Sequence, residues 1–336
     1  MAKNKITCLL LACALLTACD DNDTPADDSK AYPAIIMAEA FGYEADGTGT
    51  TWSKGETIGV YMLKSGTDEI VAPYSNLRYY ANSFDNQDYF LPGNNDSIPY
   101  FPRTGEKMDI AAYYPQATAL ADSLVAINLI ENYAYASQLL YSRVSGLSKD
   151  QRKAELPLRP ALTMLTFKFK VGYGMTEADL KGLIVTLKGL PVSGYFNAIT
   201  GKIHFRDVTT GQDIKFTATE TKAKAATRAL TRVSTRADGD KEDEKEEDGV
   251  FIIARGMVLP SSTTKGYMVT IELPAVEKVY IYDIPEGGTG DFEGSQEYIF
   301  DGQINNEDMI VSVQSSPIIN WGQGGSISGD GEENKQ

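Results

Sequence analysis

Apolar and polar residues alternate strictly over residues 165–171, and this pattern constrains the fold more than any other feature of the chain. Every second residue is apolar, and Thr166, Lys168 and Lys170 lie between. Successive side chains of a β-strand point to opposite faces of its sheet. The pattern therefore predicts a strand with one buried face and one face in water. Residues 267–273 repeat it.

Shorter apolar runs bounded by turn residues predict further strands. They are residues 34–38, 57–63, 108–114, 183–187, 250–253, 279–284 and 309–313, with a hairpin around the tight turn 197–201. Long stretches with helical 3.6-residue periodicity are missing, and residues 176–180 are expected to form one helical turn at most. Many short strands with turns between them indicate an all-β sandwich or barrel.

The first 18 residues have the three parts of a secretory signal peptide. Lys3 and Lys5 form a basic start, an apolar run covers residues 6–16, and small residues precede Cys19. The run is shorter than the roughly 20 residues that a membrane-spanning helix needs. A cysteine at this place is typical of a bacterial lipoprotein, whose thiol receives acyl chains such as palmitate. We expect cleavage before Cys19 and lipid anchoring there; an ordinary secreted protein is the alternative.

The other two cysteines, Cys8 and Cys13, lie within the signal peptide. The mature chain therefore has no disulfide, no cysteine metal site and no cysteine nucleophile. An exported protein without disulfides must be stabilised by a buried core. The length of 336 residues suits two domains of ~100–200 residues each.

Acidic residues dominate the mature chain. Loss of the two signal-peptide lysines changes the formal net charge from -15 to -17. Binding to nucleic acid requires a basic surface, so nucleic acid is not an expected partner. Residues 19–32 are predicted to form a lipidated acidic tether. The acidic residues directly after Cys19 also resemble the surface-export signal of lipoproteins in some Gram-negative anaerobes, which indicates an outer-membrane, surface-exposed location.

Two features set the expected domain limits. Pro157 and Pro160 restrict the backbone and suggest an extended linker at residues 155–160. We therefore expect an N-terminal β-sandwich over residues 33–157 and a C-terminal one over residues 158–336. Residues 217–249 are small, then basic, then acidic, with too few apolar residues for a core. They are interpreted as a disordered insertion, with a charge-paired helix as the alternative.

Residues that could carry out chemistry are scarce. His204 is the one histidine, so a histidine-rich zinc site is excluded, and no Gly-x-Ser-x-Gly elbow accompanies it. No phosphate-binding or dinucleotide-binding glycine motif occurs. Residues 283–291 and 305–308 offer oxygen ligands for calcium but do not match EF-hand spacing. We expect no catalytic residue, no metal site and no cofactor, while a carboxylate-dependent glycosidase stays open without a spacing to support it.

Five sequence blocks resemble the fimbrillin family, which comprises pilus subunits and related surface lipoproteins. They are W-S-K-G-E-T-I-G-V-Y-M at residues 52–62, Y-F-P-R-T-G at 100–105 with A-Y-Y-P at 112–115, the strand at 162–171, the turn F-N-A-I-T-G-K at 196–202, and residues 298–321 with I-I-N-W near their end. Glu56 stands where the family usually has aspartate. The blocks follow the family's order over most of the mature chain.

The resemblance implies two transthyretin-like β-sandwich domains in tandem and assembly by strand exchange. In such subunits a protease removes the N-terminal strand, and a strand from the C-terminal end of a neighbour fills the groove, which is a form of β-strand addition. The candidate first strand contains Ala34, Ile35, Ile36 and Met37. The candidate donor strand contains Met309, Val311, Val313 and Ile318.

One departure concerns the cleavage site. Polymerising subunits are cleaved after an arginine that follows the first strand, whereas the first arginine of this chain is Arg78. Only Lys30, Lys54 and Lys64 are basic between Cys19 and that position. An uncleaved subunit keeps its lipid and its first strand, which fits an anchor or a solitary surface lipoprotein.

Our leading hypothesis is a non-enzymatic surface lipoprotein that builds or anchors a fimbria and takes part in adhesion. Its expected partners are other fimbrial subunits, the membrane through its lipid, and a host or glycan ligand. The alternative is a glycan-binding surface lipoprotein of a nutrient-uptake system. The 19 tyrosines of the chain leave this alternative open, because exposed tyrosines bind both sugars and protein surfaces.

Overall fold

The computed structural model describes most of the chain between residues 32 and 318. The described ranges are 32–41, 52–82, 89–118, 120–205, 212–221, 251–261, 266–284 and 292–318. Cys19, residues 20–31 of the predicted tether and residues 222–249 of the predicted insertion lie outside them. The described part consists of strands and turns, with one short helix, α1 (Tyr133–Ala136), and one 3-10 turn (Asn95–Ser97). The prediction of an all-β fold is confirmed.

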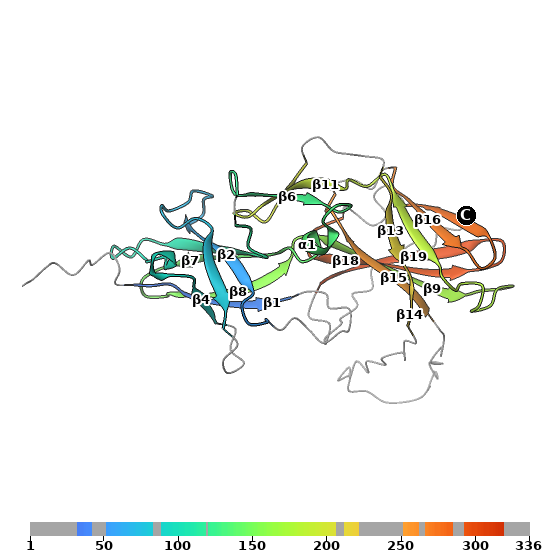
Figure 1. The fold of residues 1–336 in the computed structure, drawn as a ribbon, viewed down its shortest axis with the longest axis horizontal. Helices are drawn as coiled ribbons and strands as arrows, with labels where there is room; N and C mark the ends of the chain where they lie inside the picture. The colour runs from blue at the N-terminus through green and yellow to red at the C-terminus, as the bar shows by residue number, and fades with distance from the viewer. Residues whose placement is uncertain are drawn as a thin grey trace, which may run out of the picture.

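Seven strands form the largest sheet, in the order β1-β8-β7-β5-β2-β3-β4. They are β1 (Ile35–Ala40), β2 (Thr57–Lys64), β3 (Leu77–Ala81), β4 (Phe90–Pro92), β5 (Met108–Tyr114), β7 (Leu140–Leu147) and β8 (Lys153–Pro160). β1 pairs with β8 in parallel, and the other pairs are antiparallel. This sheet occupies one end of the elongated molecule, on the left in Figure 1.

Two more sheets occupy the other end (Figure 1). Their orders are β13-β10-β16-β17 and β14-β15-β9-β18-β19. The strands are β9 (Thr163–Val171), β10 (Ile184–Lys188), β13 (Ile214–Thr217), β14 (Thr219–Thr221), β15 (Phe251–Val258), β16 (Met268–Leu273), β17 (Lys278–Asp283), β18 (Gln296–Ile304) and β19 (Met309–Pro317). β9, the strand with strict alternation, is the central strand of its sheet, between β15 and β18.

A small third sheet connects early and late parts of the chain. It has the order β12-β11-β6, with β6 (Leu124–Asn128), β11 (Ser193–Asn197) and β12 (Ile203–His204). The predicted hairpin is present, because Tyr195 pairs with His204 and Phe196 with Ile203. The other edge of β11 pairs with β6 over five residues. This sheet lies above the middle of the molecule in Figure 1.

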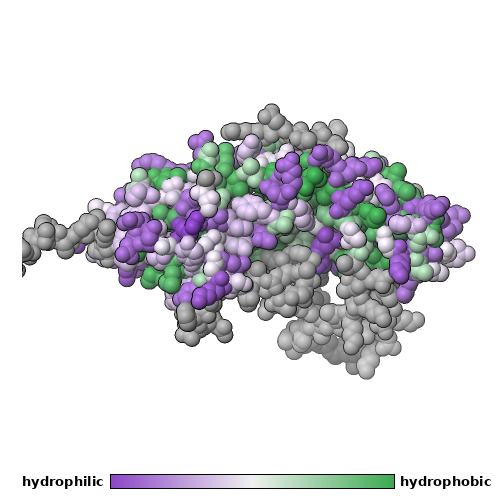
Figure 2. Space-filling view, viewed as in Figure 1, coloured by the Kyte–Doolittle hydropathy of each residue, from purple (hydrophilic) through white to green (hydrophobic). Residues whose placement is uncertain are grey.

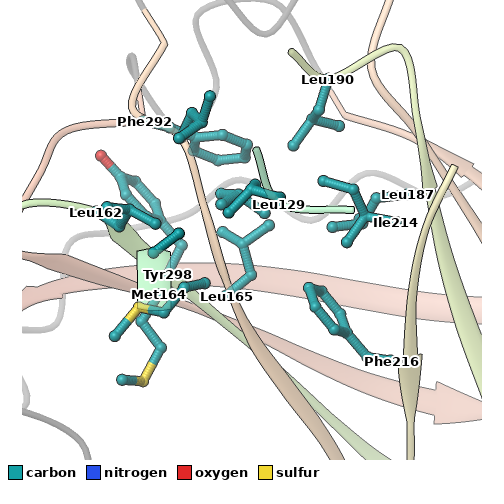
Figure 3. Packing of buried hydrophobic residues seen from close by; sticks show 14 of the residues in the cluster. Leu129, Leu162, Met164, Leu165, Leu187, Leu190, Ile214, Phe216, Phe292 and Tyr298 are labelled. Carbon is teal, nitrogen blue, oxygen red and sulfur yellow. The ribbon is translucent and has the colours of Figure 1, made fainter. Parts of the chain in front are cut away.

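The core consists of two clusters of buried residues. The larger lies between the four-stranded and five-stranded sheets and also receives Leu129, which follows β6 (Figure 3). The smaller lies on one face of the seven-stranded sheet. β2 is buried on both faces: Ile58, Val60 and Met62 enter the smaller cluster, and Tyr61 and Leu63 enter the larger. Burial on both faces explains why this strand is almost continuously apolar.

The interpretation of residues 155–160 as a linker is wrong, because these residues belong to β8. This strand pairs with β1 from Lys153 to Leu158 and with β7 at Arg159 and Pro160. Proline permits extended backbone and lacks only the N–H donor. Ala154, Leu156 and Leu158 are buried at alternate positions, so the segment contributes to the core.

The helical turn expected at residues 176–180 is present only as successive hydrogen-bonded turns. The Asp179 N–H donates to the Thr176 carbonyl, and both the N–H and the hydroxyl of Thr176 donate to the Asp179 carboxylate. These local hydrogen bonds satisfy the polar groups of the first turn, and no helix follows it. The one α-helix of the described residues, α1, was not predicted, since four residues are too few to show a 3.6-residue pattern.

Candidate functional site

The candidate first strand forms β1, at one end of the order of the seven-stranded sheet. Ile36 and Ala38 point into the smaller core cluster, while Ile35 is exposed. The Ile35 N–H donates to the Arg152 carbonyl over 3.0 Å, and the Phe41 N–H donates to the Leu158 carbonyl over 2.8 Å. β1 is therefore a short strand whose apolar side completes the core.

The other side of β1 is also in contact with the sheet. Single bridges join Pro33 to Tyr100 and Met37 to Tyr89, next to β4. The Ala34 N–H donates to the Pro99 carbonyl over 2.9 Å. β1 thus closes the gap between β8 at one end of the sheet and β4 at the other. Removing it would open a groove between these two borders.

Trp52, which belongs to the first family-like block, holds β1 in place. Its indole N–H donates to the Ala38 carbonyl over 2.7 Å. The indole ring packs edge-on against Phe90 at 5.1 Å and against Tyr114 at 5.2 Å between ring centroids. The Tyr114 hydroxyl in turn donates to the Glu56 carboxylate over 2.8 Å. The first two sequence blocks therefore meet in space and fix the position of β1.

Gly59 and Tyr113 form a second contact between these two sequence blocks. A Cβ atom on Gly59 would lie 2.2 Å from the Tyr113 ring and 2.5 Å from the Asn76 side-chain oxygen. The Tyr113 hydroxyl donates to Asn76 over 2.9 Å and accepts the N–H of Ala117 over 3.0 Å. Glycine at position 59 is required because the ring lies directly over the backbone of β2.

The turn of the β11–β12 hairpin packs against the seven-stranded sheet. A Cβ atom on Gly201 would lie 2.3 Å from the Tyr141 ring, and the Tyr141 hydroxyl donates to the Ile199 carbonyl. Asn197 shapes the turn, since its side-chain oxygen accepts the N–H groups of Ile199 and Thr200. The fourth block is therefore a contact between early and late parts of the chain.

β19, which contains most of the candidate donor residues, lies at the end of the five-stranded sheet. It pairs with β18 over nine residues, from Met309 opposite Ile304 to Pro317 opposite Gln296. Val311 is buried, Val313 packs against the larger cluster, and Ile318 is buried just after the strand. The structure places Met309, Val311 and Val313 on one face of an edge strand in a different sheet from β1, and Ile318 follows that strand.

A shallow groove of about 400 Å³ runs over the pairing of β1 with β8. Its lining residues are Met37, Ala38, Glu39, Glu155, Leu156 and Pro157. On the face of the molecule drawn in Figure 2, hydrophilic and hydrophobic residues are interspersed. The candidate site is β1 itself, with its hydrogen-bonding edges and with side chains that alternate between the core and the surface.

Asp109 and Arg143 form a buried ionic centre that the sequence analysis missed. The Asp109 carboxylate is fully buried on β5 and accepts the N–H groups of Gly66 and Gly146, the Ser65 hydroxyl and the Arg143 guanidinium. Burial alone would raise the pKa of Asp109, but these hydrogen bonds outweigh it and lower the pKa to about 2. The signal in the sequence that could have indicated this buried ion pair is the single aspartate between the apolar residues Met108 and Ile110.

The residues considered for chemistry are not brought together. His204 is exposed at the end of the two-residue strand β12. Asn305 and Asp308 form the turn between β18 and β19, where the Asn305 amide donates to the Asp308 carboxylate over 2.6 Å. Residues 285–291 lie outside the described residues. Within the described residues, no group of three or more His, Cys, Asp or Glu side chains is placed to hold a metal ion.

In the described part of the chain, no helix has the length and apolar character that crossing a membrane would require. Cys19, the expected lipidation site, lies outside that part.

Comparisons with known proteins agree with the sequence blocks. A family model described as "Fimbrillin-like" matches residues 45–321. The chain is 24% identical over 341 residues to "Putative fimbrium subunit Fim1C" of Bacteroides uniformis, covering 99% of this chain and all of that one.

Two solved structures have a similar fold. A "putative cell adhesion protein" from Bacteroides uniformis has a TM-score of 0.61 at 20% identity, covering 85% of this chain and 99% of that one. A second protein of that description, from Bacteroides ovatus, has a TM-score of 0.56 at 17% identity, covering 87% and 99%. These matches do not favour the alternative of a glycan-binding nutrient-uptake protein.

Proposed function

The chain belongs to the fimbrillin-like family, and from this premise we propose that it is a non-enzymatic structural or anchoring subunit of a fimbria. In this proposal it assembles with other fimbrial subunits and takes part in adhesion at the cell surface. The family match over residues 45–321 and the relative named as a fimbrium subunit support it.

The location follows from the first residues of the chain. The signal-peptide pattern, Cys19 and the acidic tether support export, cleavage and lipid anchoring in the outer membrane. One acyl chain binds a membrane only reversibly, so stable anchoring requires more than one. Lipid attachment leaves the domains that follow the tether free to face outward.

Strand exchange is the proposed mode of assembly, and the edge positions of β1 and β19 carry this part of the proposal. An edge strand can leave without breaking the ladders between the central strands. β1 is last in the strand order of its sheet and is joined on its other side by single bridges, so its departure would expose one edge of β8 and the apolar cluster beneath. The donor would come from the C-terminal end of a neighbour, in β19 or in the residues that follow it.

We also propose two tandem sandwich domains, with the boundary moved from the expected 157/158 to the end of β8 at Pro160, because the last residues of that strand pair with β1 and β7. The separate core cluster beneath the seven-stranded sheet supports an N-terminal unit. The pairing of β6 with β11 and the contact of Gly201 with Tyr141 would join the two units firmly. A rigid joint suits a subunit that transmits force along a fimbria or to its anchor.

The first experiment is to determine the N-terminus and mass of the protein purified from its native cell surface. A chain that begins at lipidated Cys19 supports an anchor or solitary lipoprotein and rejects a polymerising subunit. A chain that begins between residues 42 and 57, in ladders stable to mild denaturant, supports a processed subunit despite the missing arginine. Absence of the chain from fimbriae and from their anchoring complexes would reject the proposed function.

A reversible lock tests whether β1 must leave. Met37 lies opposite Glu155, so a disulfide between cysteines at these positions would tie β1 to β8. The mature chain has no other cysteine except lipidated Cys19. Oxidised protein should fail to join assemblies, and reduction should restore joining. The matched control ties Glu272 to Val279, between β16 and β17, and should assemble in both states.

A further inference from the structure

A polar pocket of about 590 Å³ shares no lining residue with the groove over β1 and β8. Its walls come from β2, from the turn before β3 and from the segment between β5 and β6. The polar side chains that line it belong to Tyr61, Ser75, Asn76, Thr118, Asp122 and Ser123. Its volume lies within the ~300–1,000 Å³ of small-molecule sites, which are usually lined mostly by apolar residues. The pocket therefore suits a ligand that is itself rich in polar groups.

Tyr61 brings to this pocket a hydroxyl group without a hydrogen-bond partner among the described residues. The residue is 0% exposed. Burial raises the pKa of Tyr61, and the nearby Ser123 side chain lowers it in part, yet the two hydroxyls do not meet in a hydrogen bond. A buried polar group that stays unpaired costs free energy. A ligand oxygen that reaches these hydroxyls would remove that cost.

Asp122 and Ser123 form a strained two-residue turn at the pocket. Their φ angles are 52° and 58°, and the Leu124 N–H donates to the Ala121 carbonyl over 2.9 Å. Two successive residues with positive φ are typical of a type I′ turn, in which asparagine and glycine are favoured. Strained backbone of this kind occurs at ligand sites, where the surrounding structure maintains it. Serine in place of glycine lowers stability here but provides a hydroxyl group that lines the pocket.

Hydrogen bonds fix the walls of the pocket. The Tyr113 hydroxyl donates to the Asn76 side-chain oxygen over 2.9 Å, and the Asn76 amide donates to the Ala117 carbonyl over 2.9 Å. On the other side, the Ala198 N–H donates to the Ser123 carbonyl over 2.9 Å. A pocket that is ordered before its ligand arrives pays less conformational entropy on binding.

The lining residues restrict the chemical class of the ligand. Ser75 and Thr118 have hydroxyls that both donate and accept, and the Asp122 carboxylate accepts. Among the described residues, no lysine, arginine or histidine lines the pocket, so an anion would face a carboxylate without a counter-charge. One carboxylate is also too few for a calcium site. Leu120 adds an apolar side chain. A neutral sugar, which combines several hydroxyls with an apolar ring face, matches this set.

We propose that the polar pocket binds one neutral sugar unit of a glycan. Asp122 accepts hydrogen bonds from two neighbouring sugar hydroxyls, and Leu120 packs against the C–H face of the ring. A sugar oxygen beside Ser123 gives the Tyr61 hydroxyl its partner. This inference goes beyond the proposed function, because a fimbrial subunit can assemble without a sugar site.

The test titrates the full mature chain, in a detergent without a sugar headgroup, with methyl glycosides of glucose, galactose, mannose and fucose. Saturation-transfer NMR reports binding, and the methyl glycoside of N-acetylneuraminic acid is the anionic comparison. At least one neutral glycoside should bind saturably, with a dissociation constant of about 1 mM for a ligand of this size. The anionic glycoside should not bind.

Two tyrosine variants form the sharpest comparison. Tyr61→Phe should weaken binding about tenfold through loss of one hydrogen bond, while the midpoint temperature of unfolding stays the same or rises. Tyr79→Phe is the matched control, because the Tyr79 hydroxyl is also buried without a partner among the described residues but does not line the pocket. It should leave binding unchanged.

Two variants of the turn test its role. Ser123→Gly removes the strain of a positive φ, so it should raise the midpoint temperature of unfolding and weaken binding. Asp122→Asn keeps a residue that tolerates positive φ and should weaken binding at least tenfold, since it removes a charged acceptor. Near-ultraviolet circular dichroism shows that each variant is folded.

Three results would overturn the inference: no neutral glycoside binds, the anionic glycoside binds as tightly as the neutral ones, or Tyr61→Phe binds as the wild type does. Binding is measured on the isolated chain. Its absence therefore rejects the sugar site and leaves the proposed fimbrial role unaffected.

Discussion

Arg143 donates two hydrogen bonds to one carboxylate oxygen of Asp109, from Nε over 3.2 Å and from Nη2 over 2.9 Å. The pair joins β5 to β7 at a point where the pairing of the two strands shifts register. Arg143 also donates to exposed Asp68 over 2.8 Å, so it ties in the turn after β2. A buried carboxylate is tolerated here because a cation and three further donors surround it.

Asp109→Asn should lower the free energy of unfolding by about 2–4 kcal/mol. The substitution leaves the largely buried Arg143 without its buried counter-charge. It also replaces one acceptor oxygen by an amide NH2 group, which cannot accept hydrogen bonds from the surrounding donors. Urea denaturation measures the loss. Asp68→Asn, which removes an exposed partner of the same arginine, should cost less than about 1 kcal/mol. Equal losses for the two variants would contradict the assigned role of Asp109.

The same carboxylate predicts how stability depends on pH. The pKa of Asp109 falls from 3.8 to about 2 in the folded chain, so its contribution is fully present above about pH 4. It is lost as the pH falls from about 4 to 2, and it amounts to roughly 2 kcal/mol. Denaturation at pH 5, 4, 3 and 2 should show this loss in the wild type. In Asp109→Asn this part of the pH dependence should be missing.

Gly201→Ala should destabilise the protein by about 2–4 kcal/mol. Two causes add: a positive φ of 72°, which costs a residue with a Cβ atom about 1 kcal/mol, and the clash with the Tyr141 ring. Gly182→Ala is the matched control, because its φ is 73° and no atom lies within 4 Å of the added Cβ. Thermal unfolding compares them. The excess loss at Gly201 measures the contact between the hairpin turn and β7.

Trp52→Phe should loosen β1 without unfolding the protein. Phenylalanine keeps the ring packing against Phe90 and Tyr114 but cannot donate to the Ala38 carbonyl, a loss of about 1 kcal/mol. Local opening should make amide hydrogen exchange in β1 about fivefold faster. Tyr114→Phe removes the bond to Glu56 in the same aromatic group and should leave β1 exchange unchanged. If exchange in β1 does not change in Trp52→Phe, the indole does not hold the strand.

Strand identities were readable from the sequence because they depend on local pattern. The alternation at residues 165–171 predicted β9, and the run at residues 108–114 coincides with β5. The apolar run at residues 57–63 predicted β2, whose residues Ile58, Val60 and Met62 lie on one buried face. It did not reveal that Tyr61 and Leu63 are buried on the other face, because a second covering layer is not encoded in the strand itself.

Contacts between distant residues could not be read in this way. The prolines of residues 155–160 suggested a linker, yet the parallel pairing with β1 makes these residues part of a sheet. The bonds from Trp52 to Ala38 and from Arg143 to Asp109 join residues 14 and 34 positions apart. Such pairs depend on how strands order themselves within sheets, and local periodicity does not fix that order.

The sequence by itself determined that this chain is acidic, built from strands and similar to fimbrillins, because charge, alternation and short motifs are properties of short segments. Only the tertiary structure decided that β1 closes the sheet beside β8, that its buried face accepts small side chains, and that β19 lies in another sheet. The physical reason is that the size of a groove is set by residues that meet only after folding.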